Sequence, residues 1–255
     1  MFGIFAKVVR GQSIKSRLRP RLSRQDVEAF YVASLADTLE TAFAMDPAPW
    51  LFLHGGADRA AVEDLRMRLQ SIHFDVTRWE QLRVHTQSGG DLGSRLENAF
   101  DVMHARRDPA GGTAPDGAIS DACLIVGSDS PSLTPRMLRP GLQALVDPDP
   151  QRAADVVLGP ATDGGYWCIG LRQPVPGLLQ NVAWSTERTL LDTVERCRAL
   201  RLRVRLLERW TDADHPEDLR TLGRQIRALR SAGDTRCAQH VERVLRRAGY
   251  LDAAH

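Results

Sequence analysis

The sequence predicts an α/β protein with three layers, in which helices cover both faces of a mostly parallel sheet. Short apolar runs typical of buried strands alternate with longer stretches of helical periodicity. Two of these runs, 155–159 and 166–171, flank a tight Asp-Gly-Gly turn at 163–165, which indicates one hairpin late in the chain. The alternation continues on both sides of the glycine-rich loop 107–120, so we predict a single domain over residues 1–255.

The strands are predicted from apolar runs bounded by turn residues. The run 122–126 is continuously apolar, as expected for a central strand that is covered on both faces. The run 201–207 alternates Arg with Leu and Val, which is typical of an edge strand. The full set of predicted strands is 2–7, 50–54, 74–76, 82–85, 122–126, 155–159, 166–171 and 201–207.

The helices are predicted from apolar positions that recur with helical spacing. Capping residues or proline mark several of their starts, at Ser23, Thr134-Pro135, Ser185 and Pro216. The predicted helices are the segment from Ser23 to before Pro47, 58–70, the segment ending near Arg106, 134–146, 186–200, the segment after Pro216 and 233–248.

Composition excludes several classes of protein. The net charge is +2, from 34 basic and 32 acidic residues, so no strong field points to nucleic acid or to a membrane surface. No apolar run approaches the roughly 18 residues that a membrane span needs, and the first apolar stretch is too short for a signal peptide. The four cysteines lie far apart, which argues against a zinc site and favours reduced thiols in a cytoplasmic protein.

Lysine is used only at Lys7 and Lys15, and every other basic residue is arginine. We interpret the two lysines as compact positive charges kept for binding phosphate, with chance placement as the alternative. Lys15 and Arg17 lie in a basic loop, 8–22, that follows the first predicted strand. The loop contains neither a P-loop nor a dinucleotide-binding glycine pattern, so an ATPase and a dehydrogenase are disfavoured.

Acidic residues and glycines follow several other predicted strands. Asp129 comes just after the strand 122–126, where a lone carboxylate suits a divalent cation but also suits a turn cap. Asp214 lies in the acidic segment 212–214 and is a candidate second ligand, with helix capping before Pro216 as the alternative. Gly89 and Gly90 precede a helix, an arrangement that allows close approach of a flat or anionic ligand.

Six sequence blocks resemble a bacterial family of nucleotide-diphospho-sugar transferases of the GT-A fold, DUF2064. They are Lys15–Leu18 (K-T-R-L in the family), Gly90–Leu96 (G-D-L-G-x-R-L), Gly127–Thr134 (G-S-D-x-P-x-L-T), Asp155–Tyr166 (D-V-V-L-G-P-A-x-D-G-G-Y), Trp184–Thr186 (W-S-T) and Asp212–Leu219 (D-x-D-T-P-E-D-L). The chain departs from the family pattern at Val9, where proline is usual, and at His215, where threonine is usual.

The resemblance implies a Rossmann-like GT-A fold with a nucleotide-binding half, a metal- and acceptor-binding half and an additional C-terminal helix, over 1–110, 121–220 and 233–250. It implies Mg²⁺ or Mn²⁺ held by Asp129 and Asp214, and catalytic roles for Asp163 and Lys15. The nucleotide would be bound by Lys7, Lys15, Arg17, Gln87, Gly89, Gly90, Asp91, Arg95 and Ser128. The acceptor would be bound by Asp163, Gly164, Gly165, Tyr166 and Trp184.

The function that the resemblance favours is metal-dependent transfer of a sugar from a nucleotide-diphospho-sugar to a small-molecule acceptor. One alternative is a nucleotidyltransferase that joins an NTP to a phosphorylated small molecule and releases pyrophosphate, because a single Asp after a strand with a nearby Lys suits that chemistry. Another is a non-catalytic nucleotide-binding module. No nucleic-acid partner is expected, since acidic residues offset the arginines. The base, the sugar, the acceptor and the choice between monomer and homodimer stay open.

Overall fold

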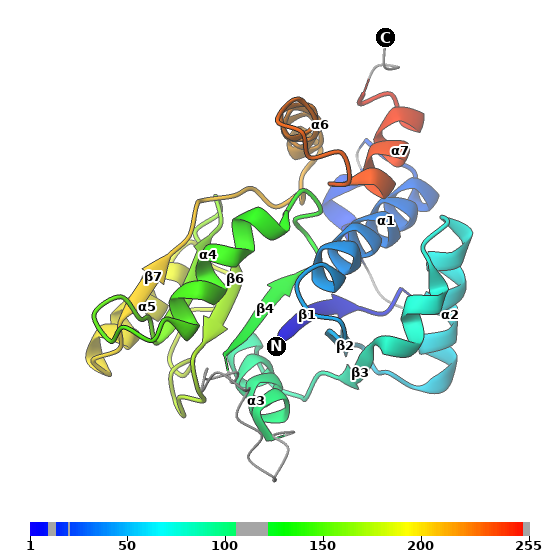
Figure 1. Ribbon diagram of the computed structural model, residues 1–255. Coiled ribbons are helices and arrows are strands. Elements are labelled where there is room, and N and C mark those ends of the chain that lie inside the picture. The colour runs from blue at the N-terminus through cyan, green and yellow to red at the C-terminus, as the bar shows by residue number, and fades with distance from the viewer. Residues whose placement is uncertain (10–13, 20, 106–121, 252–255) are drawn as a thin grey trace. The chain divides into compact units, whose positions relative to one another are not determined.

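Seven strands form one sheet in the computed structural model, which describes residues 1–9, 14–19, 21–105 and 122–251 (Figure 1). The strands are β1 (Phe2–Lys7), β2 (Trp50–His54), β3 (Arg83–Thr86), β4 (Cys123–Gly127), β5 (Val156–Pro160), β6 (Tyr166–Leu171) and β7 (Val204–Leu206). Their order across the sheet is β3-β2-β1-β4-β6-β5-β7. β2 is parallel to β3 and β5 to β7, whereas β6 is antiparallel to both β4 and β5. The predicted mostly parallel sheet with one late hairpin is confirmed.

Helices flank the sheet and alternate with its strands along most of the chain. The α-helices are α1 (Arg24–Phe43), α2 (Arg59–Ser71), α3 (Leu92–Ala105), α4 (Pro135–Val146), α5 (Thr189–Ala199), α6 (Pro216–Ser231) and α7 (Gln239–Arg247), and the short 3₁₀ helices are η1 (Ser16–Leu18) and η2 (Val76–Gln81). The Ser23 hydroxyl accepts a hydrogen bond from the Asp26 N–H, as its predicted capping role requires. No helix in the described ranges has the length and apolar character needed to cross a membrane.

Four predicted elements were wrong in type or in extent, and one of them is the edge strand, which spans Val204–Leu206 rather than 201–207. The predicted strand 74–76 is instead the approach to η2, because the Asp75 carboxylate caps that helix by accepting from the Thr77 N–H. Ser185 does not cap α5, which begins four residues later at Thr189; Ser185 has a left-handed backbone, with φ 60°. The C-terminal helix begins at Gln239 rather than near residue 233.

The chain divides into two compact units, which we describe separately. The hairpin unit comprises residues 1–3, 87–126 and 136–210. The lysine unit comprises residues 4–86, 127–135 and 211–255.

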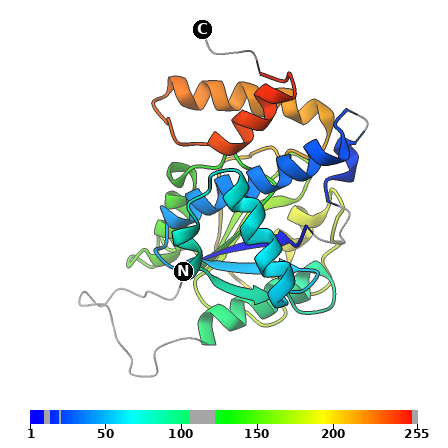
Figure 2. The same cartoon turned by 90° about the vertical axis from the view of Figure 1, so that its right-hand side faces the viewer.

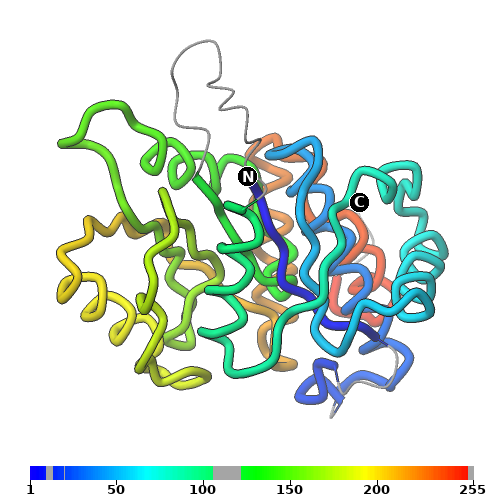
Figure 3. Tube along the Cα trace, turned by 90° about the horizontal axis from the view of Figure 1, so that it is seen from below, coloured from blue at the N-terminus to red at the C-terminus, as the bar shows by residue number. Residues whose placement is uncertain are grey.

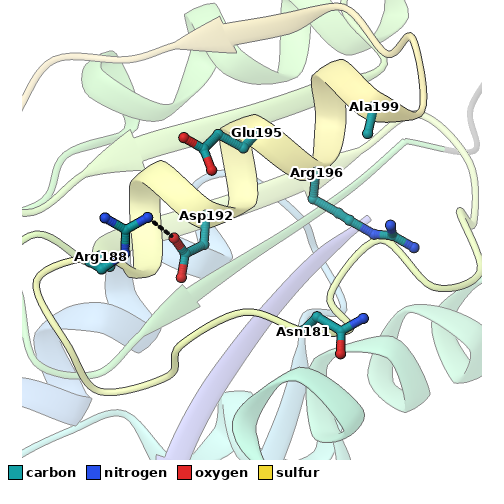
Figure 4. Close-up of a pocket in the computed structure, with 6 residues that line it drawn as sticks. All are labelled: Asn181, Arg188, Asp192, Glu195, Arg196 and Ala199. Carbon is teal, nitrogen blue, oxygen red and sulfur yellow. Dashed lines mark hydrogen bonds and ion pairs between the residues drawn. The ribbon is translucent and has the colours of Figure 1, made fainter.

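The hairpin unit contains the β5–β6 pair, with β7 next to β5 at the edge, as the Arg-rich alternation predicted. Helix α4 packs on one face of these strands, and α5 lies on the opposite face (Figures 1 and 4). Close packing against α4 explains glycine in β6, because a Cβ at Gly170 would lie 2.8 Å from the Leu145 side chain.

The lysine unit contains β2 and β3, which run side by side (Figure 3), and a group of helices around α1. Helix α7 packs along α1, and α6 lies next to α7 (Figure 2). Fifteen buried residues form the apolar core of this group: Leu18, Leu22, Val27, Phe30, Ala33, Ala213, Leu219, Leu222, Ile226, Cys237, Ala238, Val241, Val244, Leu245 and Leu251. Leu18 and Ala213 belong to this core, so two loops that carry candidate site residues are anchored in it.

Candidate functional site

Lys15 is presented by a tight turn in the lysine unit. Its backbone is left-handed, with φ 43° and ψ 37°, and it precedes η1. The Leu18 N–H donates to the Lys15 carbonyl over 3.0 Å, and the Leu18 side chain is fully buried. The anchored leucine therefore holds the turn, and the turn directs the lysine side chain inward, where only 4% of it is exposed.

The ammonium group of Lys15 lies between two carboxylates. Its Nζ is 2.8 Å from Asp129 Oδ1 and 2.6 Å from Asp214 Oδ1, and it also donates to the Ala213 carbonyl over 2.9 Å. Asp129 follows β4, as predicted, and the Ala213 N–H donates to the Asp129 carbonyl over 3.0 Å. Three segments that are distant in the sequence thus meet at one buried cation.

The electrostatics of this cluster favour the charged forms of Lys15 and Asp214. Burial alone lowers the pKa of Lys15, but the Asp129 and Asp214 carboxylates outweigh burial and hold that pKa above its usual value. Burial raises the pKa of Asp214, and the Lys15 charge and hydrogen bond overcome this effect, so the pKa is lowered overall. The Asp129 and Asp214 side chains remain 46% and 40% exposed, which leaves both accessible to a ligand.

Asp214 is positioned by the start of α6. The Asp218 carboxylate accepts hydrogen bonds from the Asp214 N–H over 3.1 Å and from the His215 N–H over 2.7 Å. This arrangement satisfies backbone donors at the helix N-terminus without using the Asp214 side chain. Asp214 is therefore free of the capping role that the sequence left open for it, and its carboxylate faces Lys15 instead.

A third carboxylate, Asp212, was not among the predicted site residues. It accepts a hydrogen bond from the Ser130 hydroxyl, and Ser130 is only 2% exposed. Burial and the charge of Asp129 raise the pKa of Asp212 to about 7 despite the opposing Ser130 bond and Lys15 charge. The acidic pair 212 and 214 was visible in the sequence, but only the fold shows that both side chains approach Lys15 and the Asp129 turn.

The other predicted nucleotide-binding residues of the lysine unit have simpler surroundings. The Lys7 and Arg17 side chains are exposed, whereas Ser128 is buried. The backbone of Lys7 is held by Tyr31, whose hydroxyl accepts from the Lys7 N–H over 2.6 Å and donates to its carbonyl over 2.9 Å. Tyr31, which fixes the end of β1 in this way, was not among the predicted site residues.

In the hairpin unit, the loop 87–91, which was predicted to bind the nucleotide, is ordered by its own side chains. Asp91 Oδ1 accepts from the Ser94 N–H and hydroxyl, both over 2.8 Å, as an N-cap of α3 does. Arg95 donates to the Gln87 side chain over 3.2 Å, and Gln87 is buried. Gly90 has φ +97°, which only glycine adopts readily. Asp91 and Arg95 therefore shape this loop, and Gly89 has open space where a side chain would be.

The Asp163-Gly164-Gly165 turn joins β5 to β6 and packs against the start of α5. Asp163 is exposed, and its Oδ1 accepts from the Gly165 N–H over 2.9 Å. Gly164 has φ +89°, and a Cβ there would lie 2.5 Å from the Glu187 Cα. The Leu190 N–H also donates to the Gly164 carbonyl over 2.9 Å. Gly164 thus has a clear packing role, while the carboxylate of Asp163 stays accessible.

Tyr166 and Trp184 contact each other edge to face, with ring centroids 6.2 Å apart. Burial raises the pKa of Tyr166, so its hydroxyl stays protonated. The indole N–H of Trp184 is buried without a hydrogen-bond partner among the described residues. Trp184 also packs on α3, since a Cβ at Gly93 would lie 2.7 Å from its Nε1. Trp184 therefore links the first turn of α3 to the start of β6 within this unit.

An open pocket of about 370 Å³ lies along α5 and includes none of the predicted site residues (Figure 4). Its lining residues are Asn181, Arg188, Asp192, Glu195, Arg196 and Ala199. Arg188 pairs with Asp192 over 3.0 Å, and Arg196 donates to the Gly177 carbonyl over 3.0 Å. Three of its lining side chains, those of Arg188, Asp192 and Arg196, are thus already engaged in contacts within the protein.

The donor set in the lysine unit suits a magnesium or manganese ion. Within the described part of the chain, no group of three or more His, Cys, Asp or Glu side chains is arranged to hold a metal. However, Mg²⁺ commonly takes only one or two carboxylates and completes its coordination with water and phosphate. Asp129 and Asp214 converge on one cation position and are partly exposed, so they fit that pattern.

Comparison with known proteins supports this fold assignment. Residues 38–186 match the profile of a family described as an uncharacterized protein conserved in bacteria, DUF2064. No curated protein matches the chain. Among solved structures, a proposed nucleotide-diphospho-sugar transferase from Desulfovibrio desulfuricans G20 is 21% identical, with a TM-score of 0.74 and coverage of 99% of this chain and 98% of that one.

Two further structures resemble the chain more weakly. A cytidylyltransferase from Leptospira borgpetersenii serovar Hardjo-bovis (strain JB197) is 10% identical, with a TM-score of 0.48 and coverage of 100% of this chain and 97% of that one. A CMP:2-keto-3-deoxy-manno-octonic acid synthetase complexed with CTP is 15% identical, with a TM-score of 0.42 and coverage of 91% and 98%. Because the family profile spans more than half of the chain, the protein belongs to the DUF2064 family.

Proposed function

We propose that the protein is a metal-dependent transferase that moves a sugar from a nucleotide-diphospho-sugar to a small-molecule acceptor. The observation that carries the proposal is the placement of Lys15 Nζ within hydrogen-bonding distance of both Asp129 and Asp214. A buried ammonium beside two accessible carboxylates supplies what a diphosphate needs, namely a fixed positive charge and a position for a divalent cation. The fold shared with the Desulfovibrio protein agrees with this chemistry.

The roles of the residues follow from where charge develops. Breaking a bond between a sugar and a phosphate leaves negative charge on the diphosphate. Lys15 would donate hydrogen bonds to a phosphate oxygen once the diphosphate replaces the carboxylates as its partners. Asp129 and Asp214 would hold Mg²⁺ or Mn²⁺, and that ion, when bound, would help to neutralise the departing diphosphate. Asp163, exposed on the hairpin turn, is the candidate group for accepting the acceptor proton or binding a sugar hydroxyl.

A second candidate function is nucleotidyl transfer. One specific observation favours it: a single aspartate, Asp129, follows β4 and is paired directly with the lysine of the first loop. The same lysine and metal position would serve a triphosphate, with pyrophosphate as the leaving group. Both reactions require the cluster, so the cluster alone does not choose between them.

Product analysis separates the two reactions. The protein is incubated with Mg²⁺ or Mn²⁺ and panels of nucleotide-diphospho-sugars or NTPs, each with candidate acceptors. Release of a nucleoside diphosphate from a nucleotide-sugar supports glycosyl transfer, and pyrophosphate from an NTP supports nucleotidyl transfer. Nucleotide binding without either product would favour a non-catalytic binding module. A thermal-shift screen can select the ligands beforehand, since ligands that bind only the native state raise its stability.

Substitution of Asp129 tests the metal role. We expect Asp129→Ala to abolish metal-dependent nucleotide binding with little loss of stability, because Asp129 is 46% exposed and Lys15 keeps Asp214 and the Ala213 carbonyl as partners. Glu63→Ala is the matched control, since Glu63 is 52% exposed and lies on α2 outside the cluster. Isothermal calorimetry measures nucleotide affinity with Mg²⁺ present. Unchanged affinity in Asp129→Ala would show that the metal assignment is wrong.

A further inference from the structure

The cation position of the Asp129–Asp214 pair is filled by a side chain of the protein itself. Lys15 Nζ contacts Asp129 Oδ1 and Asp214 Oδ1, the same two groups that the proposed function assigns to a metal. We propose that in the nucleotide-free protein Lys15 acts as an internal counter-ion that excludes the divalent metal. The ligand that the site accepts is then a metal–diphosphate complex rather than the free metal ion. This inference rests on the proposed function for the assignment of the metal.

The three donor positions of the ammonium group are all used. Lys15 binds Asp129, Asp214 and the Ala213 carbonyl, and a lysine ammonium has three N–H donors. The group is nearly fully buried, so moving it away without a new acceptor would leave a desolvated charge unpaired. Without a ligand, the hydrogen bonds and the charge of the Lys15 ammonium are therefore already satisfied by Asp129, Asp214 and the Ala213 carbonyl.

A metal and the lysine cannot share this position. An octahedral Mg²⁺ needs its oxygen ligands at about 2.0–2.1 Å, so an ion bound by both carboxylates would lie between the oxygens that Lys15 now contacts. Two cations would then be in contact in a partly buried site, where their repulsion is weakly screened. Entry of the metal consequently requires displacement of the Lys15 ammonium.

A diphosphate removes this obstacle. Its oxygens can accept hydrogen bonds from Lys15 in place of the carboxylates, and they also supply the remaining ligands that a magnesium or manganese ion requires. Arg17, exposed on the same loop, adds a second positive charge to the region, and it acts on Asp214 electrostatically. Diphosphate and metal thus favour each other's binding through Lys15, as linkage between two ligands demands.

The experiment compares Mn²⁺ binding by the full chain and by Lys15→Met, first without any phosphate ligand. We expect Lys15→Met to bind Mn²⁺ alone at least about tenfold more tightly than the original chain, because the competing charge is gone. Arg24→Met is the matched control for loss of one positive charge, since Arg24 is 80% exposed and lies outside the cluster. Its affinity for Mn²⁺ should be unchanged. Lys15→Gln also removes the charge but keeps a polar side chain. If Lys15→Met folds poorly, Lys15→Gln takes its place and should show the same tighter binding of Mn²⁺.

The second arm titrates a preformed complex of Mn²⁺ with inorganic pyrophosphate, and here the expected order is reversed. Lys15→Met should bind this complex at least about tenfold more weakly than the original chain, because a phosphate contact is lost. Equal or weaker binding of Mn²⁺ alone by both Lys15 variants would overturn the inference. Absence of Mn²⁺ binding in every arm would overturn both the inference and the metal assignment. Tighter Mn²⁺ binding without any transferase product would leave the inference standing and reject the proposed reaction.

Discussion

Asp37 provides a stability prediction that can be worked out from its contacts. Its side chain is buried in α1, with 2% exposure, and its carboxylate accepts from the His240 N–H over 3.0 Å and from the Val241 N–H over 2.8 Å. These are N–H groups of the first turn of α7, whose own capping residue, Ala238, has no polar side chain. Asp37 therefore caps α7 from another helix, and we predict that Asp37→Ala undocks or weakens the C-terminal helix.

The expected cost follows from the lost bonds. Removing a capping side chain costs about 0.5–2 kcal/mol, and a buried donor left without an acceptor costs about 1–3 kcal/mol. Removal of the Asp37 carboxylate offsets part of this loss, because burial disfavours the charged form of that group. We expect a net loss of about 1–4 kcal/mol, a large part of the roughly 5–15 kcal/mol that stabilises a typical domain.

The assay is urea unfolding followed by circular dichroism, with hydrogen exchange to localise the effect in α7. Glu40→Ala is the matched control, because Glu40 lies one turn along α1, is 39% exposed and pairs with Arg78. A partly exposed pair of this kind contributes about 0–1 kcal/mol. If Asp37→Ala lowers the free energy of unfolding no more than Glu40→Ala does, the capping role is refuted.

The pH dependence of the free energy of unfolding is an independent test of Asp37. Burial raises the pKa of Asp37 to about 7, against the two backbone N–H bonds, which lower it; Glu40 raises it further and Arg243 lowers it. The folded state then holds this proton more tightly than the unfolded state, so its contribution to stability falls as pH rises from about 4 to about 7. Burial lowers the pKa of the adjacent His240, which acts in the opposite direction. The difference between the original chain and Asp37→Asn isolates the Asp37 contribution, and a difference that does not vary with pH would contradict it.

Three further substitutions test the candidate site. Gly164→Ala should destabilise the hairpin unit by about 1–3 kcal/mol in thermal or urea unfolding, because a Cβ would overlap the Glu187 backbone; no measurable loss would contradict the packing. Gly93→Ala should displace Trp184 and change its fluorescence, with unchanged emission as the contrary result. Lys15→Arg should weaken metal–diphosphate binding although the charge is kept, because the larger planar guanidinium does not fit the buried position of the compact ammonium. Equal affinity in calorimetry would refute this.

Local pattern was sufficient for most of the fold. The period of the apolar residues separated strands from helices, and the Asp-Gly-Gly turn at 163–165 indicated the β5–β6 hairpin. Asp129 was correctly placed at the end of β4. Capping residues predicted the starts of helices less reliably. Ser185 has a left-handed backbone, and α5 begins only at Thr189. Local signals compete with tertiary contacts at helix ends, where few residues decide the start.

The sequence by itself therefore determined the layer architecture, the late hairpin and which strand end carries Asp129. Only the tertiary structure decided that the Lys15 ammonium lies between Asp129 and Asp214, the latter 199 residues away in the chain. It also revealed the Asp37 cap of α7, which joins residues about as distant in the sequence. Periodicity and turn chemistry act over a few residues, whereas a buried charge finds its partners through the folded topology. The pairing of Lys15 with both carboxylates is thus a property of the fold.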